Sequence, residues 1–118
     1  MIAHAISKNH YTYRAEWSPE RGEYVGLCLE FPRVSRHAPT AREAIAEIEQ
    51  AVAEHVEGME RGGEAVPTSL TERRYSGSFI VRTSPALHAR LTIEAVEQRV
   101  SLNQLVVQKL AERGMMLD

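Results

Sequence analysis

The chain has 118 residues, of which 43% are hydrophobic and 25% are charged, and its formal net charge is −2. These values are typical of a soluble globular protein with one ordinary domain or two small ones. No apolar run approaches the roughly 18 residues of a membrane span, and residues 1–17 lack the apolar core of a signal peptide. We therefore expect a cytoplasmic protein that has no membrane partner.

Cysteine and histidine usage argues against a cofactor-bearing site. The single Cys28 excludes an internal disulfide, and it lies in an apolar alternating run that favours a buried small hydrophobe. No Cys or His cluster has the spacing of zinc ligands. Charge is uneven: residues 1–66 carry seven Lys and Arg against eleven Glu, and residues 67–118 carry seven against five acids. We expect no metal and no cofactor, and different partners for the two halves.

Two segments near the N-terminus alternate between apolar and polar side chains, as strands do. In residues 11–17, four apolar residues oppose Thr12, Arg14 and Glu16. In the second segment, residues 24–31, the two alternating sets are Val25, Leu27, Leu29 and Phe31 against Tyr24, Gly26, Cys28 and Glu30. The Pro- and Gly-bearing turn between the segments predicts a hairpin with one face on a core and with Glu16 and Glu30 on solvent-exposed positions.

A helix is predicted to follow a short third strand at residues 33–38. Thr40 and Glu43 have the spacing of a capping box, an apolar stripe runs to Met59, and Gly62-Gly63 supplies the stop. A three-stranded antiparallel sheet crossed by one helix is a small α+β domain, which we place at residues 1–61. Residues 62–75, with glycines, a proline and little periodicity, are predicted to be a linker.

Residues 76–118 predict one strand and two helices. In the strand, Phe79, Val81 and Thr83 face one side and Ser78, Ile80 and Arg82 face the other. The first helix has Ser84 as N-cap and Pro85 at its first position. The second helix has Ser101 as N-cap, with Gln104 as its capping-box partner.

A strand and two helices in about 40 residues bury too little surface to fold alone, and the strand would keep unpaired edge groups. A second copy solves both problems, because two strands pair antiparallel over four intertwined helices. The predicted dimer core is formed by Phe79, Val81, Leu87, Leu91, Leu102, Leu105 and Val106.

An exposed two-stranded ribbon fits the DNA major groove, where base edges are distinguishable. We expect Ser78, Ile80 and Arg82 to read bases, and the helix start at Ser101 and Asn103 to bind phosphate. The alternative is a sheet edge within one domain, with Arg82 merely solvated.

The segments "SFIVRTSPALHARL" and "VSLNQLVVQKL" resemble the ribbon-helix-helix family of DNA-binding proteins. The resemblance maps the family's base-reading positions onto Ser78, Ile80 and Arg82, and its phosphate-contacting helix start onto Ser101 and Asn103. Two positions depart from the pattern. Arg99 stands where relatives often have glycine, and Ser78 stands where many have lysine.

The segment "GEYVGLCLEFPRVSRHAPTAREAIAEIEQAV", followed by "GGEAVP", is similar to the N-terminal domain of HicB antitoxins, a truncated ribonuclease-H-like unit. The resemblance implies an antitoxin of a type II toxin–antitoxin system. Its first domain would bind and occlude a HicA-like ribonuclease toxin, and its homodimeric tail would repress its own operon by binding operator DNA. The residues that contact the toxin, and the pairing of two dimers into a tetramer, are left open.

A nuclease and a stand-alone transcription regulator are the alternatives to an antitoxin. A metal-dependent nuclease requires several strand carboxylates, but Asp118 is the one aspartate, and Glu16 and Glu30 have no third partner nearby in the sequence. We therefore expect no enzymatic activity. The second alternative is a stand-alone ribbon-helix-helix transcription regulator that has no toxin partner.

Overall fold

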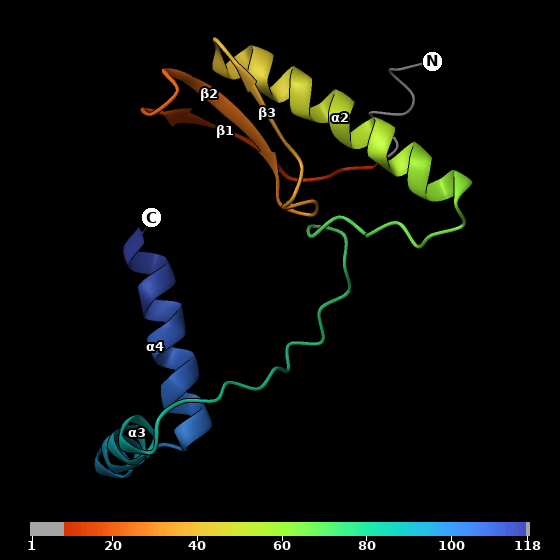
Figure 1. Cartoon of the computed structure of the whole chain (residues 1–118). Coiled ribbons are helices and arrows are strands. Elements are labelled where there is room, and N and C mark those ends of the chain that lie inside the picture. The colour runs from red at the N-terminus through yellow and green to blue at the C-terminus, as the bar shows by residue number, and fades with distance from the viewer. Residues whose placement is uncertain (1–8, 118) are drawn as a thin grey trace. The chain divides into compact units, whose positions relative to one another are not determined.

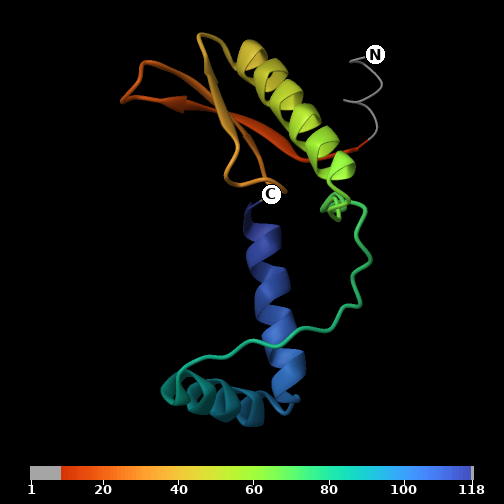
Figure 2. The ribbon, with the colours of Figure 1, turned by 45° about the vertical axis from the view of Figure 1, so that its right-hand side comes forward.

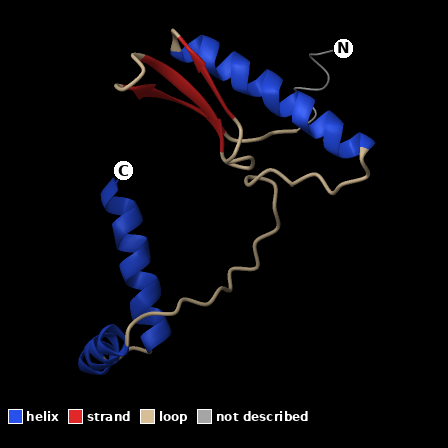
Figure 3. Ribbon diagram, in the orientation of Figure 1, coloured by secondary structure: helices blue, strands red, loops and turns tan. Residues whose placement is uncertain are grey.

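The computed structural model describes residues 9–117, and side chains as far as Glu112. The chain divides into two compact units, with the division between Ser76 and Gly77. Within the described residues, one three-stranded antiparallel sheet and three helices make up an α+β protein, as predicted (Figure 3). No described helix is both long and apolar enough to cross a membrane.

The sheet of the first unit is built from three sequential strands, β1 (Tyr13–Ser18), β2 (Glu23–Cys28) and β3 (Ser35–Ala38). They lie in the order β1-β2-β3 and are all antiparallel. Tyr13 lies opposite Cys28 in the first pair, and Tyr24 lies opposite Ala38 in the second. The predicted hairpin and third strand are therefore confirmed.

Helix α2 (Ala41–Arg61) crosses one face of this sheet (Figures 1 and 2). The Thr40 hydroxyl accepts the N–H of Glu43 at 3.1 Å, which confirms the predicted N-cap. At the other end Gly63 adopts a left-handed conformation with φ of 72°. This conformation lets the N–H of Glu64 donate to the carbonyl of Met59 at 2.9 Å, which closes the last turn of the helix.

The sheet face that packs on α2 is the one carrying Gly26 and Cys28, not the one carrying the larger side chains of Val25 and Leu27. A Cβ atom on Gly26 would lie 2.3 Å from the Ala44 carbonyl oxygen, so the helix backbone approaches the strand at this glycine. Close contact of backbones outweighs side-chain size in deciding which face is covered. The core beneath the helix is formed by Tyr11, Cys28, Phe31, Ile48, Val52 and Val56.

The second unit contains α3 (Pro85–Gln98) and α4 (Leu102–Leu117), which pack on each other. The Ser84 hydroxyl accepts the N–H of Leu87 at 3.1 Å. Ser101 and Gln104 bond reciprocally, side chain to backbone, at 3.0 and 2.9 Å. Both predicted helix starts are therefore confirmed. They were predictable because an N-cap is a local signal that needs no tertiary context.

Arg99 connects the two helices in the left-handed region, with φ of 61° and ψ of 41°. Among the described residues it is the one non-glycine with positive φ. Its N–H donates to the Val96 carbonyl at 3.1 Å, and the next N–H donates to Ala95 at 3.0 Å. Both hydrogen bonds of the turn depend on the left-handed conformation of Arg99. A residue that has a Cβ atom adopts this conformation at a cost in free energy.

Replacing Arg99 with glycine is expected to raise the free energy of unfolding by about 1 kcal/mol, because glycine adopts positive φ without a Cβ clash. Chemical denaturation at fixed protein concentration measures this change. The matched control is Arg90→Gly in the exposed interior of α3, which should lower stability by about 1 kcal/mol. A loss of stability in both variants would contradict the expectation.

The strand predicted at residues 78–83 is not formed in the single chain. Residues 78–84 have no regular secondary structure (Figure 3), and Phe79 and Val81 are 74% and 70% exposed. A strand requires backbone pairing, which the prediction assigns to a second copy of the chain. The segment runs directly into the Ser84 cap of α3.

Candidate nucleic-acid interface

The three predicted base-reading residues lie on this segment without regular secondary structure. Ser78 and Arg82 are exposed, and Ile80 is 88% exposed, an unusual position for a β-branched apolar side chain. In a strand, alternate residues point to opposite sides, so pairing would place these three on one side and Phe79 with Val81 on the other.

The predicted phosphate contacts lie at the start of α4. Ser101 and Asn103 are exposed, and the capping bond to Gln104 fixes the first turn of the helix. First-turn N–H groups have no carbonyl to bond within a helix. Together with the positive end of the helix dipole, they form a surface suited to an anion.

The apolar residues of the second unit are poorly covered. Among its described side chains, just Ala95 and Leu105 are buried, at 3% and 2% exposure. Of the predicted dimer core, Leu105 is thus buried in the single chain, Phe79 and Val81 are exposed, and four are half-buried: Leu87, Leu91, Leu102 and Val106. Sequence reasoning did not include three further apolar side chains that are exposed by more than half: Ile93, Val96 and Val107. Leu110, which the helix periodicity places on the inward face, is 56% exposed.

One ion pair joins the two helices on their polar side. Lys109 Nζ lies 3.0 Å from Glu94 Oε2, and both side chains are partly exposed. A pair of this kind contributes little to stability. The contact between α3 and α4 therefore depends on the few apolar residues between them.

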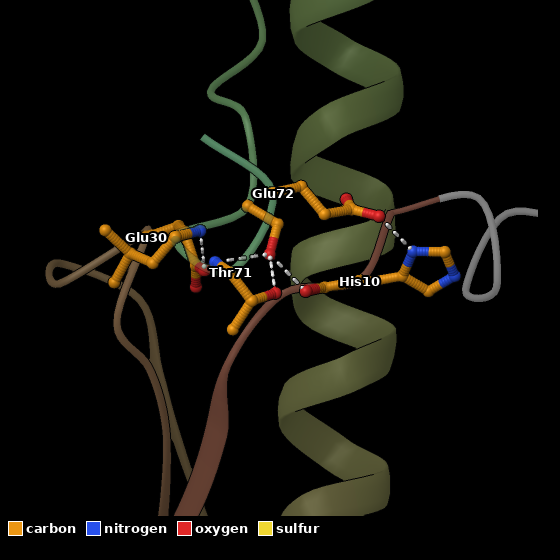
Figure 4. Close-up of polar contacts among 6 residues, drawn as sticks. His10, Glu30, Thr71 and Glu72 are labelled. Carbon is orange, nitrogen blue, oxygen red and sulfur yellow. Dashed lines mark hydrogen bonds and ion pairs between the residues drawn. The ribbon is translucent and has the colours of Figure 1, made fainter. Parts of the chain in front are cut away.

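Glu30 in the first unit was predicted on a solvent-exposed strand position, and this prediction is wrong. Strand β2 ends at Cys28, the chain turns, and Glu30 is 9% exposed. Its carboxylate accepts the N–H and hydroxyl of Thr12 at 2.9 and 3.1 Å. It also accepts the N–H of Leu70 at 2.9 Å (Figure 4). These partners are 18 and 40 residues away in sequence, so periodicity could not reveal them.

The electrostatics of this cluster follow from its hydrogen bonds. Burial alone would raise the pKa of Glu30, but the N–H groups of Leu70 and Thr12 outweigh it and hold that pKa below the ordinary value. Burial raises the pKa of the neighbouring Cys28 thiol to about 11, so the thiol is protonated at neutral pH. The cluster is therefore a structural anchor.

The other candidate carboxylate of a nuclease site, Glu16, is exposed on β1, whereas the oxygens of Glu30 are taken up by hydrogen bonds. Within residues 9–117, no group of three His, Cys, Asp or Glu side chains could hold a metal ion. His55 makes an edge-to-face contact with Phe31, with ring centroids 5.3 Å apart.

Comparison with known proteins gives one match. Residues 63–110 match the model of the HicB family, a range that includes α3, the start of α4 and all five predicted DNA contacts. No curated protein and no solved structure matches the chain. The resemblance of residues 22–52 to HicB antitoxins lies outside the matched range and stays a prediction. The match over residues 63–110 supports a HicB-type protein, and the family suggests a relation to toxin–antitoxin systems.

Proposed function

We propose that this chain is a non-enzymatic antitoxin with two binding tasks. Its second unit dimerises and binds operator DNA as a ribbon-helix-helix, which represses its own operon, and its first unit neutralises a HicA-like ribonuclease toxin by direct binding. The observation that carries the proposal is the exposed segment 79–83, which has no regular secondary structure and in which the apolar Phe79 and Val81 alternate with Ile80 and Arg82.

Dimerisation is supported by what the single chain leaves exposed. Phe79 and Val81 are exposed, and apolar residues of α3 and α4 are half-buried. Pairing the segment with its copy bonds the backbone and brings these side chains over the helices. One association thus satisfies both the polar and the apolar groups of the tail.

DNA readout is supported by the chemistry of the opposite side. In a paired ribbon, Ser78, Ile80 and Arg82 of both copies lie together and face outward. Arginine binds guanine O6 and N7 through two hydrogen bonds, serine bonds either type of base edge, and an apolar side chain packs on a thymine methyl. The start of α4 supplies backbone N–H groups for a phosphate and thereby orients the ribbon.

Toxin binding is supported by the HicB family match and by charge. Six exposed or half-buried glutamates lie along α2: Glu43, Glu47, Glu49, Glu54, Glu57 and Glu60. Such a surface attracts a basic partner and speeds its association. Co-purification with the product of an adjacent short reading frame tests this task. If no such partner exists, the toxin-free transcription regulator becomes the better description.

Arg82→Ala is expected to weaken operator binding by about 1–3 kcal/mol and to relax sequence preference, because the two-bond contact to guanine is lost. Binding to operator and scrambled DNA in a salt series measures both effects. Asn103→Ala is the matched control, since loss of a phosphate contact should weaken both DNAs alike. Unchanged operator affinity of the Arg82 variant would contradict direct readout.

A further inference from the structure

Two adjacent arginines, Arg73 and Arg74, lie shortly before the segment that carries the proposed base-reading residues. They are the one pair of neighbouring basic residues in the sequence. Both side chains are exposed, and so is Tyr75, which follows them at 69% exposure. Residues 1–66, by contrast, carry seven Lys and Arg against eleven Glu. The basic pair is therefore a local feature of an otherwise acidic first unit.

The segment that holds the two arginines, residues 67–75, is bonded to the first unit although its composition is that of a linker. Ser69 is 3% exposed, and its hydroxyl donates to the His10 carbonyl. The Leu70 N–H donates to the buried Glu30 carboxylate at 2.9 Å. Figure 4 shows both contacts. The backbone that leads to the arginines is thus held in place by hydrogen bonds.

Arg73 itself is held by two further bonds. Its N–H donates to the Ser69 carbonyl at 3.1 Å, and its Nε donates to the Thr68 carbonyl at 3.0 Å. A guanidinium has additional donors on its two Nη atoms, and the Nε bond leaves these for another acceptor. Neither Arg73 nor Arg74 forms an ion pair with a carboxylate in the part of the chain whose side chains the structure describes. The pair therefore presents two cationic groups to an external anion.

We infer that Arg73 and Arg74 bind phosphate oxygens of the DNA on which the proposed ribbon lies. This inference rests on the proposed function and extends the DNA contact to residues outside the base-reading segment. Arg74 precedes Ser78 by four positions, so their Cα atoms lie at most about 14 Å apart. The major groove is about 12 Å wide and is bordered by phosphates. A chain that places Ser78 in the groove therefore brings the arginines within reach of its edge.

Arginine suits this task because its planar guanidinium can bond two phosphate oxygens at once. Such bonds carry no sequence information, but they position a protein on the duplex and release counterions. The hydrogen bonds that already hold the Arg73 backbone reduce the ordering that the contact costs. The chain has a net charge of −2, so its long-range field repels DNA. Cations placed beside the groove offset that repulsion.

The double variant Arg73→Ala, Arg74→Ala tests the inference in the full chain. It removes two charges from each copy of a dimer, which should lower the slope of log affinity against log salt concentration by about 3 to 4. The affinities for operator and for scrambled DNA should fall by the same factor, at least about tenfold at physiological salt. Sequence preference should stay unchanged, in contrast to Arg82→Ala. Fluorescence anisotropy of labelled DNA over a salt series measures all three quantities.

The matched control is the double variant Arg21→Ala, Arg33→Ala, which removes the same charge from two exposed turn residues of the first unit. It should change the salt slope by less than about 1. Arg74→Ala alone should lower the slope by about 2. This single variant leaves the Arg73 Nε bond in place, so it answers the question even where the double variant disturbs residues 67–75. Unchanged amide shifts of β1, β2 and α2 will show that each variant is folded.

Equal slope changes in the two double variants would show that net charge alone is responsible, and would overturn the inference. An unchanged slope in Arg74→Ala would overturn it as well. In either case, a parent protein that still prefers operator over scrambled DNA would leave the proposed function standing. A parent protein that binds neither DNA would overturn the proposed function together with this inference.

Discussion

Val81→Asp is expected to raise the dissociation constant of the dimer by at least about 1,000-fold, or about 4 kcal/mol. Val81 is 70% exposed in the single chain and, on the proposed ribbon, faces the helices of both copies. Two carboxylates would enter that core without a partner, and burying an unpaired charge is costly. Analytical ultracentrifugation over a concentration series measures the change.

The neighbouring substitution Ile80→Asp provides the control, because adjacent strand residues face opposite sides. Ile80 is 88% exposed and lies on the proposed DNA side. This variant should remain dimeric but lose operator affinity, since its carboxylates repel phosphates. A dimeric Val81→Asp protein, or equal dissociation of the two variants, would exclude the ribbon arrangement.

Glu30→Gln is expected to lower the free energy of unfolding of the first unit by about 3 kcal/mol, because a neutral amide accepts fewer and weaker bonds from Thr12 and Leu70. For a unit of this size the melting temperature should fall by roughly 10–20 °C. Glu16→Gln, at an exposed position of β1, should change stability by less than about 0.5 kcal/mol. Equal effects of the two substitutions would contradict the anchor role.

The same residue predicts a pH dependence. Because the pKa of Glu30 is lower in the folded protein than its ordinary value of 4.5, the ionised carboxylate stabilises the fold above that pH. This contribution is lost as the pH falls below 4.5 and through the lowered pKa. Denaturation at several acidic pH values should show a steeper loss for the parent than for Glu30→Gln. Parallel pH profiles of the two proteins would show that protonation of Glu30 does not change the free energy of unfolding.

The helix boundaries of this protein were predictable because their signals are local. Thr40, Ser84 and Ser101 each accept an N–H three residues further on, so a short window of sequence contains both partners. Arg99 was likewise expected at a turn where glycine is common, and its positive φ agrees with that expectation. The α+β class and the three antiparallel strands follow from alternation and turn residues.

Other features were not predictable, because they depend on residues far apart or on another molecule. The covered face of β2 is decided by the approach of α2 to Gly26, which alternation alone does not indicate. The position of Glu30 depends on Leu70, in a segment with the composition of a linker. The strand proposed at residues 78–83 would be paired by a second copy, so its formation depends on association and not on this segment alone.

The sparse burial in the second unit has a consequence for gene dosage. Only Ala95 and Leu105 are buried among its described side chains, so on the proposed dimer this unit would gain its remaining burial by associating with a copy. When monomers predominate, mass action makes the dimer concentration follow the square of the chain concentration. Halving the chain concentration therefore leaves about a quarter of the dimer. Repression that depends on the dimer would therefore fall more steeply than the total concentration of the chain.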